Sequence, residues 1–400
     1  MNPPSSRPRV LLKPRKAQPF YNRHPWVFSS AIERTEGEPQ DGDLVDLISH
    51  GDHFVARGLY NSQSKLMVRL YSWDSAREID AAFWQERIER AYQLRRDLLG
   101  LVGPESGYRL ISSEADGMSG LTVDVYAGFA VVQLTSLGMA KRKDEILGAL
   151  QAVIQPRGIY LRTEKGIGTL EGIALQDGPI SGEIPPPDLT ILEHGLRLRV
   201  NLAEGQKTGY YLDQRDNRQA VAKYAAGKRV IDAFCYSGGF GLHAARAGAA
   251  SVYAIDGSEG ALQLARLNAE ANGLRGIEFT KADVFVELER MLQRGEKADI
   301  VVLDPPKFAR ARNAVNEALK GYRRLQSLGL QLLVPGGILV MCCCSGLVEP
   351  IALDEVLTQV ANGERRELQI LERRFAAPDH PVSLTCPESE YLKCLIARVW

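Results

Sequence analysis

Short apolar runs separated by turn residues fill the first part of the chain. Runs that are apolar, or that alternate with polar residues, cover residues 10–12, 43–48, 54–60 and 66–71. Pairs such as Asp41-Gly42 and Asn61-Ser62 provide breaks between these runs. The pattern predicts short strands joined by turns, and therefore a small β-barrel domain. Small barrels of this kind bind RNA, bind proteins or bind nothing.

A helix and a second set of strands predict a small α+β domain. The segment 81–99 places charged residues on one face and, on the other, Phe83, Ile88, Ala91, Leu94 and Leu98. Strand-like runs follow at 107–112, 121–126, 129–134 and 158–163, with a helix expected near 142–154. The three prolines at 185–187 can continue neither a helix nor a central strand, so we expect a boundary there.

Strands alternate with helices from about residue 189 onward. A hairpin strand is expected at 196–201 and a helix at 218–224. Later strands are expected at 230–234, 252–255, 277–281, 300–303 and 338–344, with helices between them. This alternation predicts the α/β class, with a Rossmann-like parallel sheet covered by helices on both faces. Because ligands of such folds bind beyond the C-terminal ends of the strands, chemistry is expected at those ends.

Composition narrows the class but identifies no partner. The 400 residues are too many for one compact core, and 45% hydrophobic with 24% charged residues is typical of a globular protein. Lysine plus arginine equals aspartate plus glutamate at 49 each. The N-terminus is nevertheless basic, since six basic residues and no acidic residue precede Glu33. Such a stretch suits contact with RNA, although a solvated tail has the same composition.

Cysteine usage and hydropathy indicate a compartment. The six cysteines are Cys235, Cys342, Cys343, Cys344, Cys386 and Cys394. None lies in the first half and no C-x-x-C spacing occurs, so we expect neither disulfides nor a metal. The N-terminus does not resemble a signal peptide, and no apolar run is long enough to span a bilayer. A soluble, cytoplasmic protein is expected.

The first strand of the α/β part ends in a glycine-rich turn, the segment D-A-F-C-Y-S-G-G-F-G at 232–241. Glycines let a backbone approach a ligand closely, and amides at the following helix N-terminus point at it. Asp256 ends the second strand, where a carboxylate can accept hydrogen bonds from ribose hydroxyls. NAD enzymes share this logic, but the glycine pattern is not G-x-G-x-x-G. A lone glycine turn is also common without a ligand.

Acidic residues follow the later strands too. Asp283 is placed to accept from an adenine amino group, and Asp304 opens the segment D-P-P-K-F at 304–308. Either one alone is explained as a helix N-cap. Four aspartates at successive strand ends, Asp232, Asp256, Asp283 and Asp304, are harder to explain as four caps. The sequence therefore predicts a nucleotide-type cofactor at this edge of the sheet.

Three motifs together resemble the bacterial large-subunit (23S) ribosomal RNA cytosine-5 methyltransferases. They are D-x-F-x-Y-S-G-G-F at 232–240, D-P-P-K-F at 304–308 and C-S-G-L at 344–347. Further matches are R-H-P-W-V-F at 23–28, K-T-G-Y-Y-L-D-Q-R at 207–215, D-H-P-V at 379–382 and Y-L-K at 391–393. The resemblance implies a PUA RNA-binding domain at 1–75, a central α+β domain at 76–188 and an S-adenosylmethionine (SAM)-dependent methyltransferase domain at 189–400. It further implies SAM as cofactor, 23S rRNA as partner and a role in rRNA processing, with a homodimer left open.

The resemblance also implies which residues form the site. The cofactor-binding residues would be Thr208, Gly209, Tyr211, Asp232, Phe234, Tyr236, Ser237, Gly238, Asp256, Asp283, Asp304 and Pro305. The RNA-binding residues would be Arg23, His24, Trp26, Lys307 and Arg323. Further basic residues follow D-P-P-K-F, namely Arg310, Arg312, Lys320 and Arg324, with Tyr322 among them in the sequence. This basic segment suits phosphate contacts or a solvated helix face.

Methylation at cytosine C5 requires a nucleophile. C5 is unreactive until a thiolate adds at C6 and turns the ring into an enamine. Cys342, Cys343 and Cys344 end a predicted strand, where alternation puts the first and third on one face. Each taken singly is explained as a core residue. The resemblance implies Cys344 as the catalytic cysteine and Asp304 as the hydrogen-bond partner of cytosine N3.

Other assignments stay open. The base that removes the C5 proton is Asp304, Lys307 or a bound water. An RNA or protein N-methyltransferase could use D-P-P-K without a covalent adduct, but such enzymes carry an aromatic residue where Lys307 stands. A non-catalytic RNA-binding protein is the third alternative, which the complete set of strand-end aspartates disfavours. Cys235, in the glycine turn, is expected to be structural.

Overall fold

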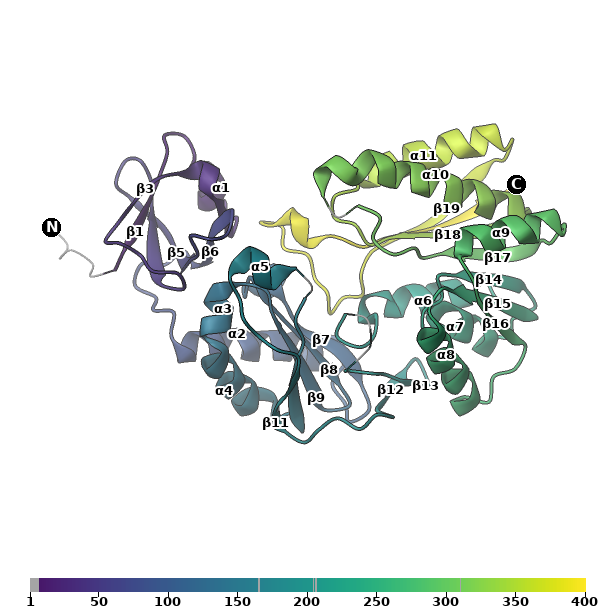
Figure 1. Cartoon of the computed structure of the whole chain (residues 1–400), viewed down its shortest axis with the longest axis horizontal. Coiled ribbons are helices and arrows are strands. Elements are labelled where there is room, and N and C mark those ends of the chain that lie inside the picture. Colours follow the sequence, from purple (N-terminus) through teal and green to yellow (C-terminus); the bar gives the residue numbers. More distant parts are fainter. Residues whose placement is uncertain (1–6, 165, 204, 206, 310) are drawn as a thin grey trace. The chain divides into compact units, whose positions relative to one another are not determined.

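A computed structural model describes residues 7–164, 166–203, 205, 207–309 and 311–400. The chain divides into two compact units, each built from segments distant in sequence (Figure 1). The first consists of Met1–Ile191, Val200–Tyr211 and Pro378–Ser389, and the second of Leu192–Arg199, Leu212–Ala377 and Glu390–Trp400. Among the described residues, no helix combines the length and apolarity needed to cross a membrane.

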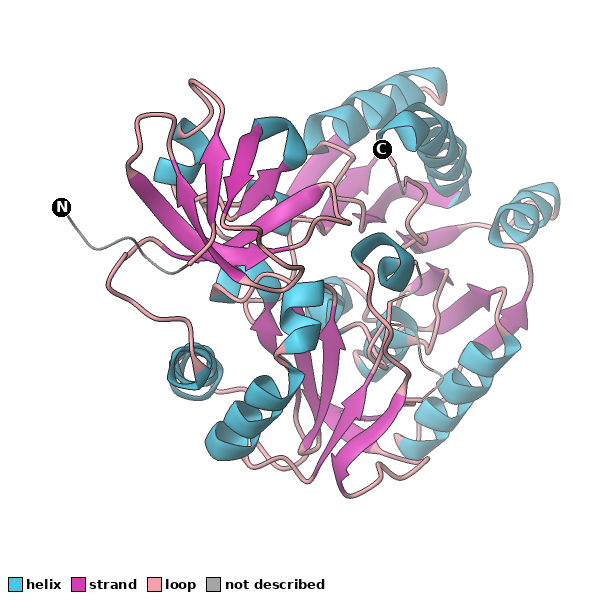
Figure 2. Ribbon diagram, turned by 60° about the vertical axis from the view of Figure 1, so that its left-hand side comes forward, coloured by secondary structure: helices cyan, strands magenta, loops and turns pink. Residues whose placement is uncertain are grey.

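The N-terminal part of the first unit is a six-stranded sheet. Its strands are β1 (Arg9–Leu12), β2 (Trp26–Phe28), β3 (Ile32–Glu36), β4 (Leu44–Ile48), β5 (Phe54–Tyr60) and β6 (Leu66–Ser72). They lie in the order β2-β6-β5-β4-β1-β3 and curl around one apolar core (Figure 2). Alternating residues such as Val45 and Leu47 point into that core. The four predicted strands are confirmed, whereas β2 and β3 are additions at the sheet edges.

The central part of the first unit is a five-stranded sheet with helices. The sheet order is β11 (Gly178–Gly182), β10 (Gly158–Leu161), β9 (Phe129–Leu134), β8 (Leu121–Tyr126) and β7 (Gly107–Ser112). The helices are α2 (Ala81–Gln93), α3 (Leu137–Lys141), α4 (Lys143–Ile154) and α5 (Ile167–Glu171). Asp80 caps α2 by accepting from the Phe83 N–H at 2.9 Å. The predicted α+β character of this segment is confirmed.

The end of the first long helix corrects one expectation. Leu98 was expected on the buried face, yet it is 76% exposed. The α-helical turns stop at Gln93, and Leu94–Leu98 forms a wider π-helical turn that changes which side chains face inward. Arg95 is buried instead, and its guanidinium forms a paired hydrogen bond with Asp116 at 2.6 and 2.9 Å.

The second unit is built on a seven-stranded sheet. Its order is β16 (Ile277–Lys281), β15 (Ser251–Asp256), β14 (Arg229–Ala233), β17 (Ala298–Leu303), β18 (Leu333–Cys343), β20 (Lys393–Val399) and β19 (Leu368–Arg374). The helices are α6 (Arg215–Ala222), α7 (Gly239–Arg246), α8 (Glu259–Ala271), α9 (Val284–Gln293), α10 (Val315–Leu332) and α11 (Pro350–Gly363). The strands from β16 to β18 are parallel, as predicted, and β20 is antiparallel to β18.

Strand alternation in this sheet produces two cores, one on each face. Ile231 and Val301 belong to one core, and Val230 and Val302 to the other. The strand order reverses between β14 and β17, because the chain moves outward to β16 and then returns to the other side of β14. A crevice beyond the C-terminal ends of β14 and β17 is the expected ligand position in such a sheet.

Candidate functional site

The turn after β14 uses left-handed backbone at alternate positions. Phe234 has φ 63°, Tyr236 φ 50° and Gly238 φ 82°. Because only glycine adopts this conformation readily, the two aromatic residues store roughly 1–3 kcal/mol of strain each. α7 follows directly, and a Cβ atom at Gly239 would come within 2.5 Å of Arg218 Nε. The turn therefore needs glycine, and it brings the first amides of α7 to the strand end.

Asp256 ends β15, and its carboxylate faces the same turn. Oδ2 accepts from the Tyr236 N–H at 2.9 Å and Oδ1 accepts from the Ser258 N–H at 2.8 Å. The side chain is half-buried. Since each carboxylate oxygen has two lone-pair sites, both oxygens remain able to accept from hydroxyl groups. The arrangement suits ribose recognition.

Asp232 lies at the C-terminal end of β14, just before the turn, and is fully buried. Its Oδ2 accepts from the Gly241 N–H at 2.7 Å, whereas its Oδ1 has no hydrogen-bond partner among the described residues. Burial, with smaller contributions from the carboxylates of Asp304 and Asp256, raises the pKa of Asp232 to about 7, although the Gly241 N–H acts in the opposite direction. Ser237 Oγ is also buried and without a partner in the described part of the chain. Buried polar groups are normally paired, so both atoms are available to a polar ligand.

Asp283 caps a helix, which is the structural role that its position in the sequence also allowed. It is the N-cap of α9, and its Oδ1 accepts from the Val286 N–H at 3.1 Å. The residue is exposed at the C-terminal side of β16. A cap of this kind stabilises a helix by about 1 kcal/mol. Contact between Asp283 and an adenine amino group stays a prediction.

Asp304 follows β17 and takes its position from a buried hydrogen-bond chain. Gln214 Nε2 donates to Asp304 Oδ2 at 3.1 Å, and Asn217 Nδ2 donates to Gln214 Oε1 at 2.7 Å. Arg374 Nε in turn donates to Asn217 Oδ1 at 3.0 Å. Since arginine can only donate, the orientation of both amides is determined, and Asp304 must act as the acceptor. Gln214 and Asn217 are no more than 2% exposed, so water does not compete for these bonds.

Cys344 follows β18 and contacts the segment that Asp304 opens. Its Sγ lies 3.9 Å from the carbonyl oxygen of Pro305. Ser345 Oγ donates to the Ala309 carbonyl at 3.1 Å, and Lys393 Nζ donates to the Ser345 carbonyl at 2.9 Å. These bonds fasten C-S-G-L to D-P-P-K-F and to β20. Cys344 is half-buried, whereas the other five cysteines are buried.

Cys342 and Cys343 pack into the two cores on opposite faces of β18, which confirms the predicted alternation for this pair. A hydrogen bond with Cys394 and burial raise the pKa of the Cys342 thiol well above its usual value. Tyr322 donates its hydroxyl to Cys343 Sγ at 3.2 Å, and both side chains are buried. Each of these two thiols thus has a packing role, and Cys344 alone of the three lies beyond the end of β18 and is partly exposed.

The basic residues after D-P-P-K-F lie mostly at the surface. Lys307 and Arg323 are exposed, and Arg323 donates to Gln359 Oε1. The expectation that Tyr322 lies among them at the RNA is wrong, because Tyr322 falls on the apolar face of α10 and is fully buried. Arg310 lies outside the described residues. RNA contact by Lys307 and Arg323 stays a prediction.

Thr208, Gly209 and Tyr211 belong to the first unit. Thr208 is fully buried, where its Oγ1 donates to Asp124 Oδ2 at 2.5 Å and lies 2.9 Å from the Tyr126 hydroxyl. Gly209 has φ 138°, and a Cβ atom there would lie 2.8 Å from a Leu202 methyl group. The side chain of Thr208 therefore holds its own segment in place, and any cofactor contact from this segment is expected from its backbone or from Tyr211.

Arg23, His24 and Trp26 also lie in the first unit. Arg23 is exposed, with φ 65°. The indole N–H of Trp26 donates to Glu114 Oε1 at 3.0 Å, and His24 Nε2 lies 3.3 Å from Glu388 Oε2. Two of the three side chains thus already have protein partners for their ring nitrogens. Their contact with RNA stays a prediction.

Sequence reasoning missed the residues that position Asp304 and Cys344. Gln214 and Lys393 were quoted only as parts of K-T-G-Y-Y-L-D-Q-R and Y-L-K. Tyr391, from the second of these motifs, donates to Asp213 Oδ2 at 2.6 Å. Membership of a motif was the available signal, but their roles depend on contacts across the fold.

Comparison with known proteins agrees with this geometry. Residues 178–398 match a family described as S-adenosylmethionine-dependent methyltransferase, and residues 10–73 match a PUA-like domain. Ribosomal RNA large subunit methyltransferase I of Shewanella denitrificans is 42% identical over 98% of this chain and 99% of its own length. The protein of the same name from Photobacterium profundum is 42% identical over 93% of this chain and 94% of its own. In fold, the chain is similar to a protein assigned as a methyltransferase and complexed with SAH, with a TM-score of 0.85 at 22% identity over 98% of this chain and 99% of that one.

Proposed function

Because the chain belongs to the S-adenosylmethionine-dependent methyltransferase family that includes ribosomal RNA large subunit methyltransferase I, we propose that it methylates C5 of a cytosine in 23S rRNA. The observation that carries the proposal is the position of Cys344, whose Sγ lies 3.9 Å from the Pro305 carbonyl. A thiol next to D-P-P is what C5 chemistry requires, and N-methylation does not need it.

The residues at the ends of β14 and β15 fit SAM. Asp232 Oδ1 and Ser237 Oγ are buried polar atoms without partners among the described residues. Asp232 lies at the end of β14, and Ser237 lies in the strained turn that leads from β14 to the N-terminus of α7. We assign the methionine part of the cofactor to this turn, with Phe234, Tyr236 and Gly238, and the ribose to Asp256. Asp283, Asp304 and Pro305, with Thr208, Gly209 and Tyr211 of the first unit, complete the proposed set. When bound, SAM supplies an electrophilic methyl group.

Cys344 acts as the nucleophile in the proposed reaction. Its thiolate adds to C6 of the cytosine, and the electron pair moves toward C5, which becomes nucleophilic. C5 then bonds to the methyl carbon, a base removes the C5 proton, and the bond between C6 and sulfur breaks to restore the aromatic ring and the thiolate. The net products are 5-methylcytosine, one proton and demethylated cofactor.

Asp304 is the proposed partner of cytosine N3. A hydrogen bond at N3 stabilises the ring as the thiolate adds, provided that the carboxyl group holds a proton when it donates. The carboxylates of Asp304 and Asp256 contribute to the raised pKa of the buried Asp232. Gln214 fixes the direction of the carboxylate through its 3.1 Å bond. Gln214 thus acts as a positioning residue.

RNA recognition is assigned to residues 1–75, with Arg23, His24 and Trp26, and to the exposed basic side chains of Lys307 and Arg323. Phosphate contacts of this kind orient the strand but do not read its sequence. The target base must leave the RNA stack to reach a pocket at the strand ends. We keep the division into residues 1–75, 76–188 and 189–400 as part of this proposal.

Substitution of Cys344 tests the proposal. Cys344→Ala should abolish methyl transfer to 23S rRNA while SAM binding, measured by calorimetry, stays within about twofold of wild type. RNA that contains 5-fluorocytidine should form a covalent complex with the wild-type protein, because the fluorine cannot leave as a proton does. Retained methyl transfer in Cys344→Ala would contradict the proposal and favour N-methylation.

A further inference from the structure

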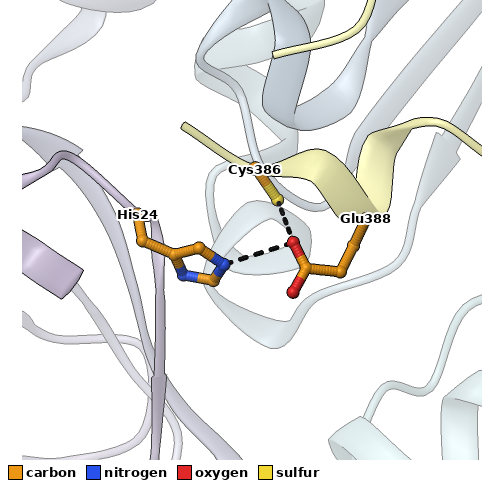
Figure 3. A group of neighbouring side chains, drawn as sticks. All are labelled: His24, Cys386 and Glu388. Atoms are coloured by element: carbon orange, nitrogen blue, oxygen red, sulfur yellow. Dashed lines mark hydrogen bonds and ion pairs between the residues drawn. The ribbon is translucent and has the colours of Figure 1, made fainter. Parts of the chain in front are cut away.

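Three metal-binding side chains converge in the first unit, outside the proposed catalytic site (Figure 3), and one of them, His24, also belongs to the proposed RNA-binding set. His24 lies before β2, and Cys386 and Glu388 lie at the 3₁₀ turn η6 (Pro387–Ser389). An imidazole nitrogen, a thiol sulfur and a carboxylate oxygen all lie within 4.8 Å of one another. Because 364 positions separate His24 from Glu388, the cluster produces no local spacing motif in the sequence. Nitrogen, sulfur and oxygen ligands of this kind are those that Zn²⁺ prefers.

Two of the three distances within the cluster match the coordination of a single ion. His24 Nε2 is 3.3 Å from Glu388 Oε2, and Cys386 Sγ is 3.5 Å from the same oxygen. Tetrahedral zinc, with bonds of about 2.0 Å to nitrogen and oxygen and about 2.3 Å to sulfur, sets these ligand spacings at about 3.3 and 3.5 Å. An N–H···O hydrogen bond is usually about 2.7–3.2 Å long. The His24–Glu388 contact is thus a long hydrogen bond, and its 3.3 Å spacing also equals the spacing that a shared metal sets.

The turn that carries two of the ligands is held by its own hydrogen bonds. The Cys386 N–H donates to the Ser383 carbonyl at 3.0 Å, and Ser389 Oγ donates to the Cys386 carbonyl at 2.7 Å. The Ser383 N–H donates to Ser389 Oγ at 2.9 Å, which closes the loop. Cys386 is fully buried, while Glu388 is exposed and leaves a path from solvent. Ligands fixed in this way lose little freedom when a metal binds.

We propose that His24, Cys386 and Glu388 bind one Zn²⁺, with water in the fourth position, and that the metal ties the segment before β2 to the turn 383–389. The Cys386 thiol releases its proton to solvent as it becomes a thiolate ligand. His24 binds through Nε2 and carries its proton on Nδ1. No group is oxidised or reduced.

Two features of the structure limit the affinity. The backbone N–H of Trp26 donates to His24 Nδ1 at 3.3 Å, and that long hydrogen bond is lost when Nδ1 carries the proton. Burial raises the pKa of the Cys386 thiol, so deprotonation opposes binding at neutral pH. The site is therefore expected to bind Zn²⁺ reversibly and to release it to a chelator.

The test uses the full-length chain without an affinity tag, stripped with EDTA and titrated with CoCl₂ and ZnCl₂. We expect one Co²⁺ per chain with a sulfur-to-cobalt charge-transfer band, and displacement of the cobalt by Zn²⁺. Cys386→Ala should lose the band, and Glu388→Gln should weaken binding at least about tenfold. His53→Gln, which changes an exposed histidine of the same unit outside the cluster, is the matched control and should bind as wild type does.

Circular dichroism shows whether each variant folds, so that a loss of metal binding is distinguished from a loss of structure. If Cys386→Ala does not fold, Glu388→Gln carries the test, because an exposed carboxamide of the same shape does not disturb packing. ZnCl₂ should raise the melting temperature of the wild type and of His53→Gln but not of Glu388→Gln. A missing charge-transfer band, a band that persists in folded Cys386→Ala, or equal affinity in Glu388→Gln would overturn the proposal.

Discussion

The buried carboxyl group of Asp232 should make the stability of the protein depend on pH in an unusual direction. Its pKa is raised from 3.8 to about 7 by burial, so the folded protein keeps a proton that the unfolded chain has lost between these values. The folded state therefore binds more protons in this window, and stability falls as pH rises. The penalty is absent below about pH 4 and complete above about pH 7. Asp232→Asn cannot ionise and should remove this dependence.

The expected size of this change in stability comes from the raised pKa of Asp232. A change from 3.8 to about 7 corresponds to about 4 kcal/mol at about 1.4 kcal/mol per pH unit, because Asp232 is fully buried and solvent does not screen it. The asparagine oxygen can still accept from the Gly241 N–H, but its NH₂ replaces the unpartnered Oδ1 and costs roughly 1–3 kcal/mol. Asp232→Asn should thus be less stable than wild type at pH 4 and more stable at pH 8.

Urea unfolding followed by far-UV circular dichroism, without SAM, measures this effect between pH 4 and pH 8. The difference in free energy of unfolding between variant and wild type should shift by about 4 kcal/mol across that range and should change sign. Asp80→Asn is the control, since it exchanges one good helix cap for another at α2. A difference between Asp232→Asn and wild type that does not vary with pH would refute the reasoning.

Four further substitutions test the positioning of Asp304, the choice of nucleophile and the RNA contacts. Gln214→Glu places a second carboxylate next to that of Asp304, to which Gln214 Nε2 donates at 3.1 Å. The kcat for methyl transfer should therefore fall by about 10–100-fold in steady-state assays. A change under about twofold would show that Gln214 does not position Asp304. Cys343→Ala should retain methyl transfer and lower the free energy of unfolding by about 1–2 kcal/mol in urea titrations, because its buried thiol packs in the core and accepts a hydrogen bond from Tyr322. An inactive but folded variant would shift the nucleophile away from Cys344. Lys307→Ala and Arg323→Ala should each reduce the slope of log affinity for RNA against log salt by about one in anisotropy titrations, and unchanged slopes would exclude them from the interface.

The alternating pattern predicted the parts of the fold that depend on local sequence. Strand and helix periods located the parallel strands β14 to β18, and the rule that ligands bind at strand ends directed attention to Asp232, Asp256 and Asp304. These residues do lie within one position of the C-terminal ends of β14, β15 and β17, which are neighbours in the sheet. The prediction worked because parallel strands bring their C-terminal ends to one edge whatever the intervening loops do.

Features that depend on distant contacts could not be predicted in the same way. The link between Gln214 and Asp304 joins residues 90 positions apart, and the Zn²⁺ cluster joins His24 to Glu388 across 364 positions. Leu98 was misplaced because a π-helical turn interrupts the 3.6-residue period on which its assignment rested. Tyr322 was assigned to the surface from its charged neighbours, although the helical period places it on the apolar face of α10.

The identity of the methylated nucleoside decides whether this protein methylates cytosine C5. Purified chain, SAM with an isotopically labelled methyl group, and 23S rRNA that lacks its native methylation would be incubated, and the RNA digested to nucleosides for liquid chromatography and mass spectrometry. We expect label in 5-methylcytidine, and no label in RNA treated with Cys344→Ala. Label in an N-methylated nucleoside, or no transfer to RNA by the wild-type protein, would contradict it.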